Sequence, residues 1–540
     1  MKRSSLLLLF VTLLMVGYTF ALQTHGNLPG LQPTRAGAQT VSPSLLTDVP
    51  GISNDVSVHY RDMKADFTKD VDGALNTNRY AIAAQLTLES DAVIRGTQRV
   101  RYTNRTNVPL DRVVFRLYPN TLPMFTVGQM SVANVSVNGV RVKSRLSGGD
   151  TVLTVPLSKS LKPSEAVEIA LDFSLLIKRG MSSYDFERLG YANDVVSGGS
   201  WYPVLSVYDV GRGWWTEPIA SSEGDPTYTQ TGLYDVRLTV PNEMALAASG
   251  TVIDQKANSD GTITYRIVTG PMRDCGFMAS KRYTVTTTQV DGTQLNIWHY
   301  KDRANTPEDG TQDAVETAKA VLPLFNRLFG QYPYRELDIV QHPTLSGLEF
   351  PGLVTISEGS WSHGDETLAE TIVHEVGHQW FYGLVGNNQV EYPWLDEALA
   401  TYTQVVYTRE TDSTGKSGEA IARLHSRLRS LFTEAIQQGD IPDLPLNLPV
   451  ADYPNKYYGL LVYERGQLFY LELEEMLGHE VLYKALRQYV DRFKYGVATS
   501  KDLKVAIEEV SGKNLSDLFK KWVGDYDQDT KPASDLFRER

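Results

Sequence analysis

The hydrophobic periodicity of this chain changes near residue 310, and that change constrains the fold more than any other feature. Between about residues 60 and 300, short β-branched and aromatic runs repeat with a period of two residues. From Asp313–Leu328 onward, the apolar residues follow helical spacing. Period two is typical of strands, and spacing of three and four residues is typical of amphipathic helices. The pattern therefore predicts an α+β multidomain chain, with an antiparallel all-β domain at 56–300 and a mainly helical domain at 301–525.

Residues 1–21 have the organisation of an export signal. Lys2 and Arg3 precede an apolar run that extends from Leu6 to Phe20, and a cut after Ala21 fits the small-residue rule for signal cleavage. This run falls short of the roughly 20 apolar residues that span a bilayer, which favours a cleaved signal over an uncleaved membrane anchor. We therefore expect a secreted or extracytoplasmic protein with no stable membrane span after cleavage.

Composition narrows the possible domain organisation and the possible partners of the chain. Residues 22–55 are rich in Pro, Gly, Ser and Thr without periodicity and are predicted to be a flexible linker, while 526–540 read as a polar tail. The single cysteine, Cys275, excludes a disulfide within one chain. The formal charge of −12 argues against a nucleic-acid partner, because phosphate binding needs clustered Lys and Arg. The sequence carries no indication of an oligomeric state.

A short motif on a predicted helix, Asp365–Tyr382, carries metal-binding chemistry. His374 and His378 are four residues apart, so they lie one turn apart on the same helix face. Two imidazoles in this arrangement can bind one zinc ion, and Glu375 can hold the water that the metal acidifies. The alternative interpretation is that two histidines and an acid coincide on a polar helix face.

A third ligand in a suitable place favours the zinc interpretation. Glu397 lies 19 residues beyond His378, on a second predicted helix that begins near Pro393. A helix-turn-helix can return Glu397 to the same ion. Two His, one Glu and one water make an open four-coordinate site, which is typical of catalytic zinc. Phe381 and Leu384 stand where a metzincin requires glycine and histidine, so that class is excluded.

The segments His374–Phe381 and Trp394–Ala398 together resemble the aminopeptidase N (membrane alanyl aminopeptidase) family of zinc metallopeptidases. This family is of the gluzincin type, so the resemblance implies a thermolysin-like catalytic domain at 301–525 and one zinc ion held by His374, His378 and Glu397. The similarity extends more weakly through most of residues 60–525. The large C-terminal helical domain of many members has no counterpart before Arg540, which implies an open cleft.

Two further segments resemble motifs of the same family. Ser346–Gly352 is similar to its Gly-x-Met-Glu-Asn segment, which implies that Glu349 grips the free amino terminus of the substrate. Val462–Gly466 is similar to its Tyr-x-Lys-Gly segment, which implies that Tyr463 donates a hydrogen bond to the oxyanion.

The chain also departs from the family pattern in three places. Leu348 and Phe350 replace the usual Met and Asn, Ala398 replaces a usual glycine, and the β half lacks the Gln-rich segment that helps bind the substrate amino group.

Together these features predict an exported zinc-dependent aminopeptidase that hydrolyses N-terminal residues from peptides through a zinc-activated water. Glu375 and Tyr463 are the predicted catalytic residues, and Glu349 is the predicted substrate-binding residue. An alternative enzyme is a zinc endopeptidase with an open cleft. An alternative of another class is a non-catalytic binding or surface module that zinc stabilises.

Overall fold

The computed structural model describes residues 49, 51–121, 128–180, 188–209, 211–219, 223–304, 306–343 and 346–532. The predicted signal peptide, most of the predicted linker and the last part of the predicted tail lie outside these residues. No helix within the described ranges is both long enough and apolar enough to cross a membrane.

The largest sheet has eight strands in the order β16-β17-β14-β1-β2-β8-β4-β5. Its neighbouring strands are antiparallel except for β1 and β14, which are parallel. The strand bounds are β1 Asn78–Leu88, β2 Ala92–Thr103, β4 Gly128–Val137, β5 Val140–Arg141, β8 Ala166–Ile177, β14 Gly232–Pro241, β16 Thr251–Ala257 and β17 Thr262–Val268.

Two four-stranded sheets, in the orders β11-β3-β7-β6 and β15-β18-β10-β9, pack with the large sheet, and β12 and β13 form a hairpin. One hydrophobic core contains side chains from the eight-stranded sheet and from both of these four-stranded sheets, because alternate residues along the strands face inward. Their bounds are β3 Leu110–Arg116, β6 Arg145–Ser147, β7 Val152–Leu161, β9 Leu189–Ala192, β10 Val195–Gly198, β11 Val204–Leu205, β12 Tyr208–Asp209, β13 Gly213–Trp214, β15 Ala245–Ala248 and β18 Phe277–Ser280.

A fourth sheet links the two halves of the chain. Strands β19 (Tyr283–Val290) and β20 (Thr293–Tyr300) are antiparallel, and β20, β21 (Glu336–His342) and β22 (Leu353–Ser357) are parallel. The predicted domain boundary at residue 300 therefore falls inside a continuous sheet. Helix α3 (Thr311–Phe329) connects β20 to β21 and contacts both β19 and β20, as a parallel crossover needs.

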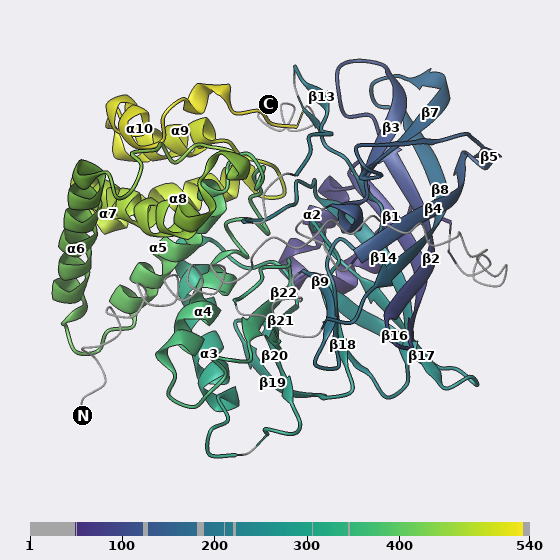
Figure 1. Ribbon diagram of the computed structural model, residues 1–540, viewed down its shortest axis with the longest axis horizontal. Helices are drawn as coiled ribbons and strands as arrows, with labels where there is room; N and C mark the ends of the chain where they lie inside the picture. The colour runs from purple at the N-terminus through teal and green to yellow at the C-terminus, as the bar shows by residue number, and fades with distance from the viewer. Residues whose placement is uncertain are drawn as a thin grey trace.

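Apart from α2, the helices gather on the side of the molecule away from the large sheet, with α3 and α4 next to the fourth sheet (Figure 1). Helix α4 packs against α3, α5 and β22, so it is covered on several sides. The predicted fold class, a β-rich half followed by a mainly helical half, is confirmed. The helix bounds are α2 Thr68–Gly73, α4 Glu366–Gly377, α5 Trp394–Glu410, α6 Ser417–Gln438, α7 Arg465–Leu477, α8 His479–Phe493, α9 Ser500–Ser511 and α10 Ser516–Trp522.

Helix α4 ends earlier than its hydrophobic pattern predicts. The prediction of helix as far as Tyr382 is wrong, because the helix stops at Gly377 and His378 caps it. Tyr382 adopts a φ of 142°, which a right-handed helix cannot contain, and its carbonyl accepts a hydrogen bond from Arg273 of the β half. A tertiary contact therefore overrides the helical pattern over the last few residues.

Candidate metal centre

Helices α4 and α5 approach closely, and this approach brings the predicted ligands together. The side chain of Asp365 caps α4 by accepting a hydrogen bond from the backbone of Thr367. At Gly377 a Cβ atom would lie 2.6 Å from the hydroxyl of Thr403 on α5, so only glycine permits this helix spacing. Glu397 stands in the first turn of α5 and is buried against the end of α4.

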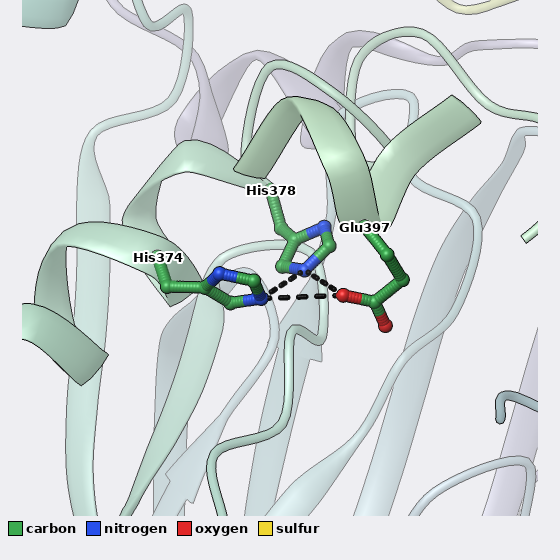
Figure 2. A group of neighbouring side chains, drawn as sticks. All are labelled: His374, His378 and Glu397. Atoms are coloured by element: carbon green, nitrogen blue, oxygen red, sulfur yellow. Dashed lines mark hydrogen bonds and ion pairs between the residues drawn. The ribbon is translucent and has the colours of Figure 1, made fainter. Parts of the chain in front are cut away.

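The three predicted ligands point their ligating atoms toward one another (Figure 2). The Nε2 atoms of His374 and His378 are 3.1 Å apart, and Oε2 of Glu397 lies 3.2 Å and 3.3 Å from them. Zinc bonds of about 2.0–2.1 Å in tetrahedral geometry imply ligand separations of roughly 3.3–3.4 Å. The triangle therefore fits three ligands of one zinc ion; His378 and Glu397 are buried and His374 is partly buried, whereas the one other such cluster among the described residues, His425, Glu472 and Glu475, has no buried member.

The pKa values of the three ligands show strong electrostatic interaction. Burial opposes charge on His378, yet the carboxylate of Glu397 raises the pKa of His378 to about 9. Burial likewise acts to raise the pKa of Glu397, but the two imidazoles hold it well below its usual value. Burial lowers the pKa of His374. Two imidazoles at this separation cannot both carry a proton on Nε2, which leaves nitrogen lone pairs available to a cation.

A backbone carbonyl orients one of the imidazoles. Nδ1 of His378 lies 3.2 Å from the carbonyl oxygen of Phe381, so an N–H on Nδ1 donates outward and Nε2 faces the triangle. The carboxylate of Asp396, next to the ligand Glu397, accepts hydrogen bonds from Asn387 and Gln389. The hydrogen bond from Nδ1 of His378 to the Phe381 carbonyl is the kind of support that metal-ligating histidines require.

Glu375 is buried on α4, directly beside the loop that leads to Glu349. A Cβ atom at Gly347 would lie 2.1 Å from Oε1 of Glu375, so the carboxylate rests against the bare backbone of that loop. Burial raises the pKa of Glu375 to about 8. A nearby divalent cation acts in the opposite direction, because it favours the charged carboxylate. The arrangement provides a basic group next to the triangle of ligands.

Tyr463 also lies at this site, as the sequence predicts. Its ring stacks near the ring of His374, with centroids 6.0 Å apart and an interplanar angle of 22°. Tyr463 belongs to a π-helical turn, Leu460–Glu464, that runs into α7. Such turns are rare and often occur at functional sites, because they redirect a side chain out of the helical register. Ala398, on the facing helix α5, is accommodated by Gly466, where any Cβ would lie 2.3 Å from that of Ala398.

Glu349 is buried, and other side chains already contact it. Its Oε1 atom accepts hydrogen bonds from the guanidinium of Arg188 and, at 3.1 Å, from the amide of Gln389. Arg188 also forms an ion pair with Asp225. The structure therefore places Glu349 in the active-site region but within a polar network. Its role as the amino-terminal grip stays a prediction.

Arg188, Asp225 and Gln389 were not predicted from the sequence. Arg188 and Asp225 come from the β half, whose sequence has no counterpart to the family's Gln-rich segment. Neither Arg188 nor Asp225 belongs to a periodic pattern or a recognisable motif. The turn-forming segment Gly224–Pro226 is the one sequence signal, and it indicates a loop at Asp225 without indicating a function. Arg188 and Glu349 are separated by 161 positions, and only the folded structure brings them together.

A second group of possible ligands, His425, Glu472 and Glu475, does not form a comparable centre. Arg429 donates hydrogen bonds to both carboxylates and lies 3.2 Å from the imidazole nitrogen of His425. A guanidinium already supplies the positive charge that a cation would bring. This cluster is therefore a surface ion-pair network.

Comparison with known proteins agrees with the geometry. Residues 313–522 match the Peptidase family M1 domain. Aminopeptidase 2, mitochondrial, of Saccharomyces cerevisiae is 29% identical over 225 residues, which is 39% of this chain and 23% of the relative. Aminopeptidase RNPEPL1 of Mus musculus is 31% identical over 220 residues, which is 39% of this chain and 29% of the relative. The chain thus spans less than a third of either relative.

The fold is shared with a solved structure of similar length. The M1 zinc metallopeptidase from Deinococcus radiodurans superposes with a TM-score of 0.59 and 18% identity, covering 83% of this chain and 93% of that one. The matches to the Peptidase family M1 domain and to aminopeptidases confirm the resemblance that the sequence predicts, and the matched residues 313–522 contain all three converging ligands, so the metal centre lies in the part of the chain that is similar to a peptidase family M1 domain.

Proposed function

We propose that this protein is a zinc-dependent aminopeptidase that removes N-terminal residues from peptides. The convergence of His374, His378 and Glu397 at tetrahedral separations is the observation that carries the proposal. Glu375 beside this triangle and Tyr463 against His374 supply the two further groups that peptide hydrolysis requires. One zinc ion held by the three ligands is the expected cofactor.

When bound, a zinc ion supplies Lewis acidity that lowers the pKa of water and polarises the scissile carbonyl. Glu375 accepts the proton of the attacking water at a carboxylate oxygen and then passes it to the leaving amine. Tyr463 donates its O–H to the oxygen on which negative charge develops. Burial keeps the pKa of Tyr463 well above its ordinary value, so the phenol retains the proton that it donates.

Replacing Tyr463 with phenylalanine is expected to lower kcat by about 10²- to 10³-fold, the usual effect of losing one oxyanion donor. KM is expected to change little, because the donor acts mainly where charge develops. Steady-state kinetics on an aminoacyl anilide measure both quantities. Tyr457→Phe is the matched control, since the Tyr457 hydroxyl donates to the carbonyl of Asp440 at an exposed position. Equal losses in both variants would contradict a role for Tyr463 in the reaction.

A single peptide with and without an N-terminal acetyl group tests the aminopeptidase assignment. Acetylation removes the positive charge of the amino group, so an aminopeptidase is expected to lose cleavage of the first bond by at least about 10²-fold. Mass spectrometry of the products identifies the bond that is cut. Undiminished cleavage of the acetylated peptide would instead support a zinc endopeptidase, and no cleavage of either peptide would support a zinc-stabilised binding module.

The N-terminal signal supports the further proposal that the protein is exported. Lys2 and Arg3, followed by the apolar run and Ala21, have the organisation that export machinery recognises. The intact mass of the protein recovered from the extracytoplasmic fraction is expected to match a chain that starts at Leu22. Recovery of the full-length chain from the cytoplasm would contradict export.

A further inference from the structure

Residues of the small sheet β11-β3-β7-β6 and of the β12–β13 hairpin line a cavity of about 750 Å³ in the β half. Strands β3, β7 and β13 lie together at one end of that half (Figure 1). The volume falls within the roughly 300–1,000 Å³ that is typical of small-molecule sites. The cavity shares no residue with the metal centre. It is therefore a second candidate binding site.

Strand alternation explains which side chains reach this cavity. Phe115 of β3 faces the hydrophobic core, so its neighbour Val114 faces the cavity, as does Arg112 two residues earlier. Thr154 of β7 pairs with Val114 on one side and with Arg145 of β6 on the other, so these three side chains form one row. From the usual spacing of strands and residues, the Cα atoms of Arg112 and Arg145 are roughly 12 Å apart.

The cavity carries uncompensated positive charge. Three arginines line it, Arg112, Arg145 and Arg212, whereas no acidic side chain of the described residues does. Glu391 neutralises Arg212, because both of its carboxylate oxygens lie 2.7 Å from one guanidinium nitrogen. Arg112 has a weak contact of 3.7 Å with the exposed Asp111, and Arg145 forms no hydrogen bond or ion pair within the described ranges. We call this site the arginine cavity, and it contrasts with the formal charge of −12 on the whole chain.

Trp214 gives the arginine cavity an aromatic wall. The centroid of its ring lies 5.5 Å from that of Tyr102 and 5.4 Å from that of Tyr208, and both tyrosines support the partly exposed indole. The face of an aromatic ring is negative, so it attracts the slightly positive C–H bonds of a sugar ring. Asn107 and Thr154 also line the cavity, and their uncharged polar groups can exchange hydrogen bonds with hydroxyl groups.

These features together define the chemistry of a matching ligand. A guanidinium group binds a carboxylate through two parallel hydrogen bonds. Arg112 and Arg145 stand on strands that are not neighbours, with β7 between them, so two carboxylates on one extended ligand fit them better than one compact anion does. An acidic peptide supplies the charge but lacks the rigid C–H face that Trp214 can bind.

We propose that the arginine cavity binds an acidic oligosaccharide, with uronic acid carboxylates at Arg112 and Arg145 and a sugar ring against Trp214. This gives the β half a binding role that is separate from the proposed peptidase activity. A negative result at this cavity would leave the aminopeptidase assignment unchanged, and a chain that cleaves no peptide could still bind the saccharide.

Calorimetry with the zinc-loaded, full-length protein tests the proposal. The probes are a hyaluronan tetrasaccharide, tetragalacturonic acid and the methyl esters of both, in which the carboxylate charge is removed. At least one acid is expected to bind, and its ester is expected to bind at least about 10-fold more weakly, because charge-assisted hydrogen bonds are lost. Arg145→Gln and Trp214→Ala are each expected to weaken the acid by a similar factor, whereas Trp214→Phe keeps an aromatic face and is expected to lose less.

Arg141→Gln is the matched control, because Arg141 is an exposed arginine on the neighbouring strand β5 and does not line the arginine cavity. Its expected effect on the affinity is less than about 3-fold. Thermal melting and peptide hydrolysis confirm that each variant is folded. If Trp214→Ala does not fold, Arg145→Gln and Trp214→Phe still decide the result.

Four outcomes would overturn the proposal. The first is that neither acidic tetrasaccharide binds, and the second is that acid and ester bind equally. The third is that Arg145→Gln and the folded Trp214 variants bind like the wild type, which would place the saccharide elsewhere. The fourth is that N-acetylated tetraglutamate or inorganic phosphate binds as tightly as the acidic saccharide, which would indicate a site for acidic peptides or for simple anions.

Discussion

Replacing Glu375 with glutamine is expected to lower kcat by about 10²- to 10⁴-fold, while the protein keeps its zinc and its fold. Glutamine has nearly the same shape but cannot accept the proton of the attacking water, so the variant loses general acid–base catalysis. The carboxylate is not one of the three converging ligands, so the metal content is expected to remain at one ion per chain. Kinetics, metal analysis and thermal melting measure the three quantities.

Glu366→Gln is the matched control, because it makes the same chemical change in the first turn of the same helix. Its expected cost is at most about 1 kcal/mol of helix stability, through loss of a negative charge near the helix N-terminus. An unchanged rate in Glu375→Gln would show that another group takes the proton. A loss of zinc in that variant would show instead that Glu375 helps to hold the metal.

The metal ligands could be predicted from the sequence because helical geometry is local. His374 and His378 share a face at a spacing of four residues in any α-helix, and a following helix can return Glu397 to the same point. The structure places their ligating atoms 3.1–3.3 Å apart. Strands such as β19, Tyr283–Val290, could also be predicted from the sequence, because the alternation of side chains between the two faces of a strand is a property of one segment.

Features that depend on contacts between distant segments could not be predicted in this way. The parallel strands β21 and β22 have almost no exposed face, so they lack the alternation that marks a half-buried strand. The early end of α4 depends on Arg273, which lies 109 positions before its partner Tyr382. The contacts of Glu349 could not be predicted either, because its partner Arg188 lies 161 positions away and no residue of the motif around Glu349 indicates it.

The side chains of the site come from two different halves of the chain. The predicted metal ligands and the proposed general base Glu375 come from one short segment of the chain, α4 with its C-cap and the start of α5. The groups that set the charge around Glu349 come from the β half, through Arg188 and Asp225. Under the proposed function, substitutions in the β half are therefore expected to change which peptides bind without altering helices α4 and α5.

Replacing Glu397 with glutamine is expected to lower zinc affinity by at least about 10²-fold, and kcat/KM should fall with the zinc content. Metal ligands contribute more than the residues that orient them, whose loss already costs 10- to 100-fold. The amide keeps an oxygen but loses the negative charge that raises the pKa of His378 and that would offset the charge of a dication. After dialysis, metal analysis is expected to find well under one ion per chain.

Chelation and a second substitution on the same helix complete this test. A chelator is expected to abolish wild-type activity and to lower Tm, because a ligand present at 1,000 times its Kd contributes about 4 kcal/mol to stability. Added zinc is expected to restore the wild type but not Glu397→Gln. Glu410→Gln, at the end of α5, breaks only a partly exposed ion pair with Arg327 and is expected to keep full zinc content. Full zinc and full activity in Glu397→Gln would mean that the two histidines bind the metal with some other third ligand, and the spatial convergence at α5 would then have no catalytic purpose.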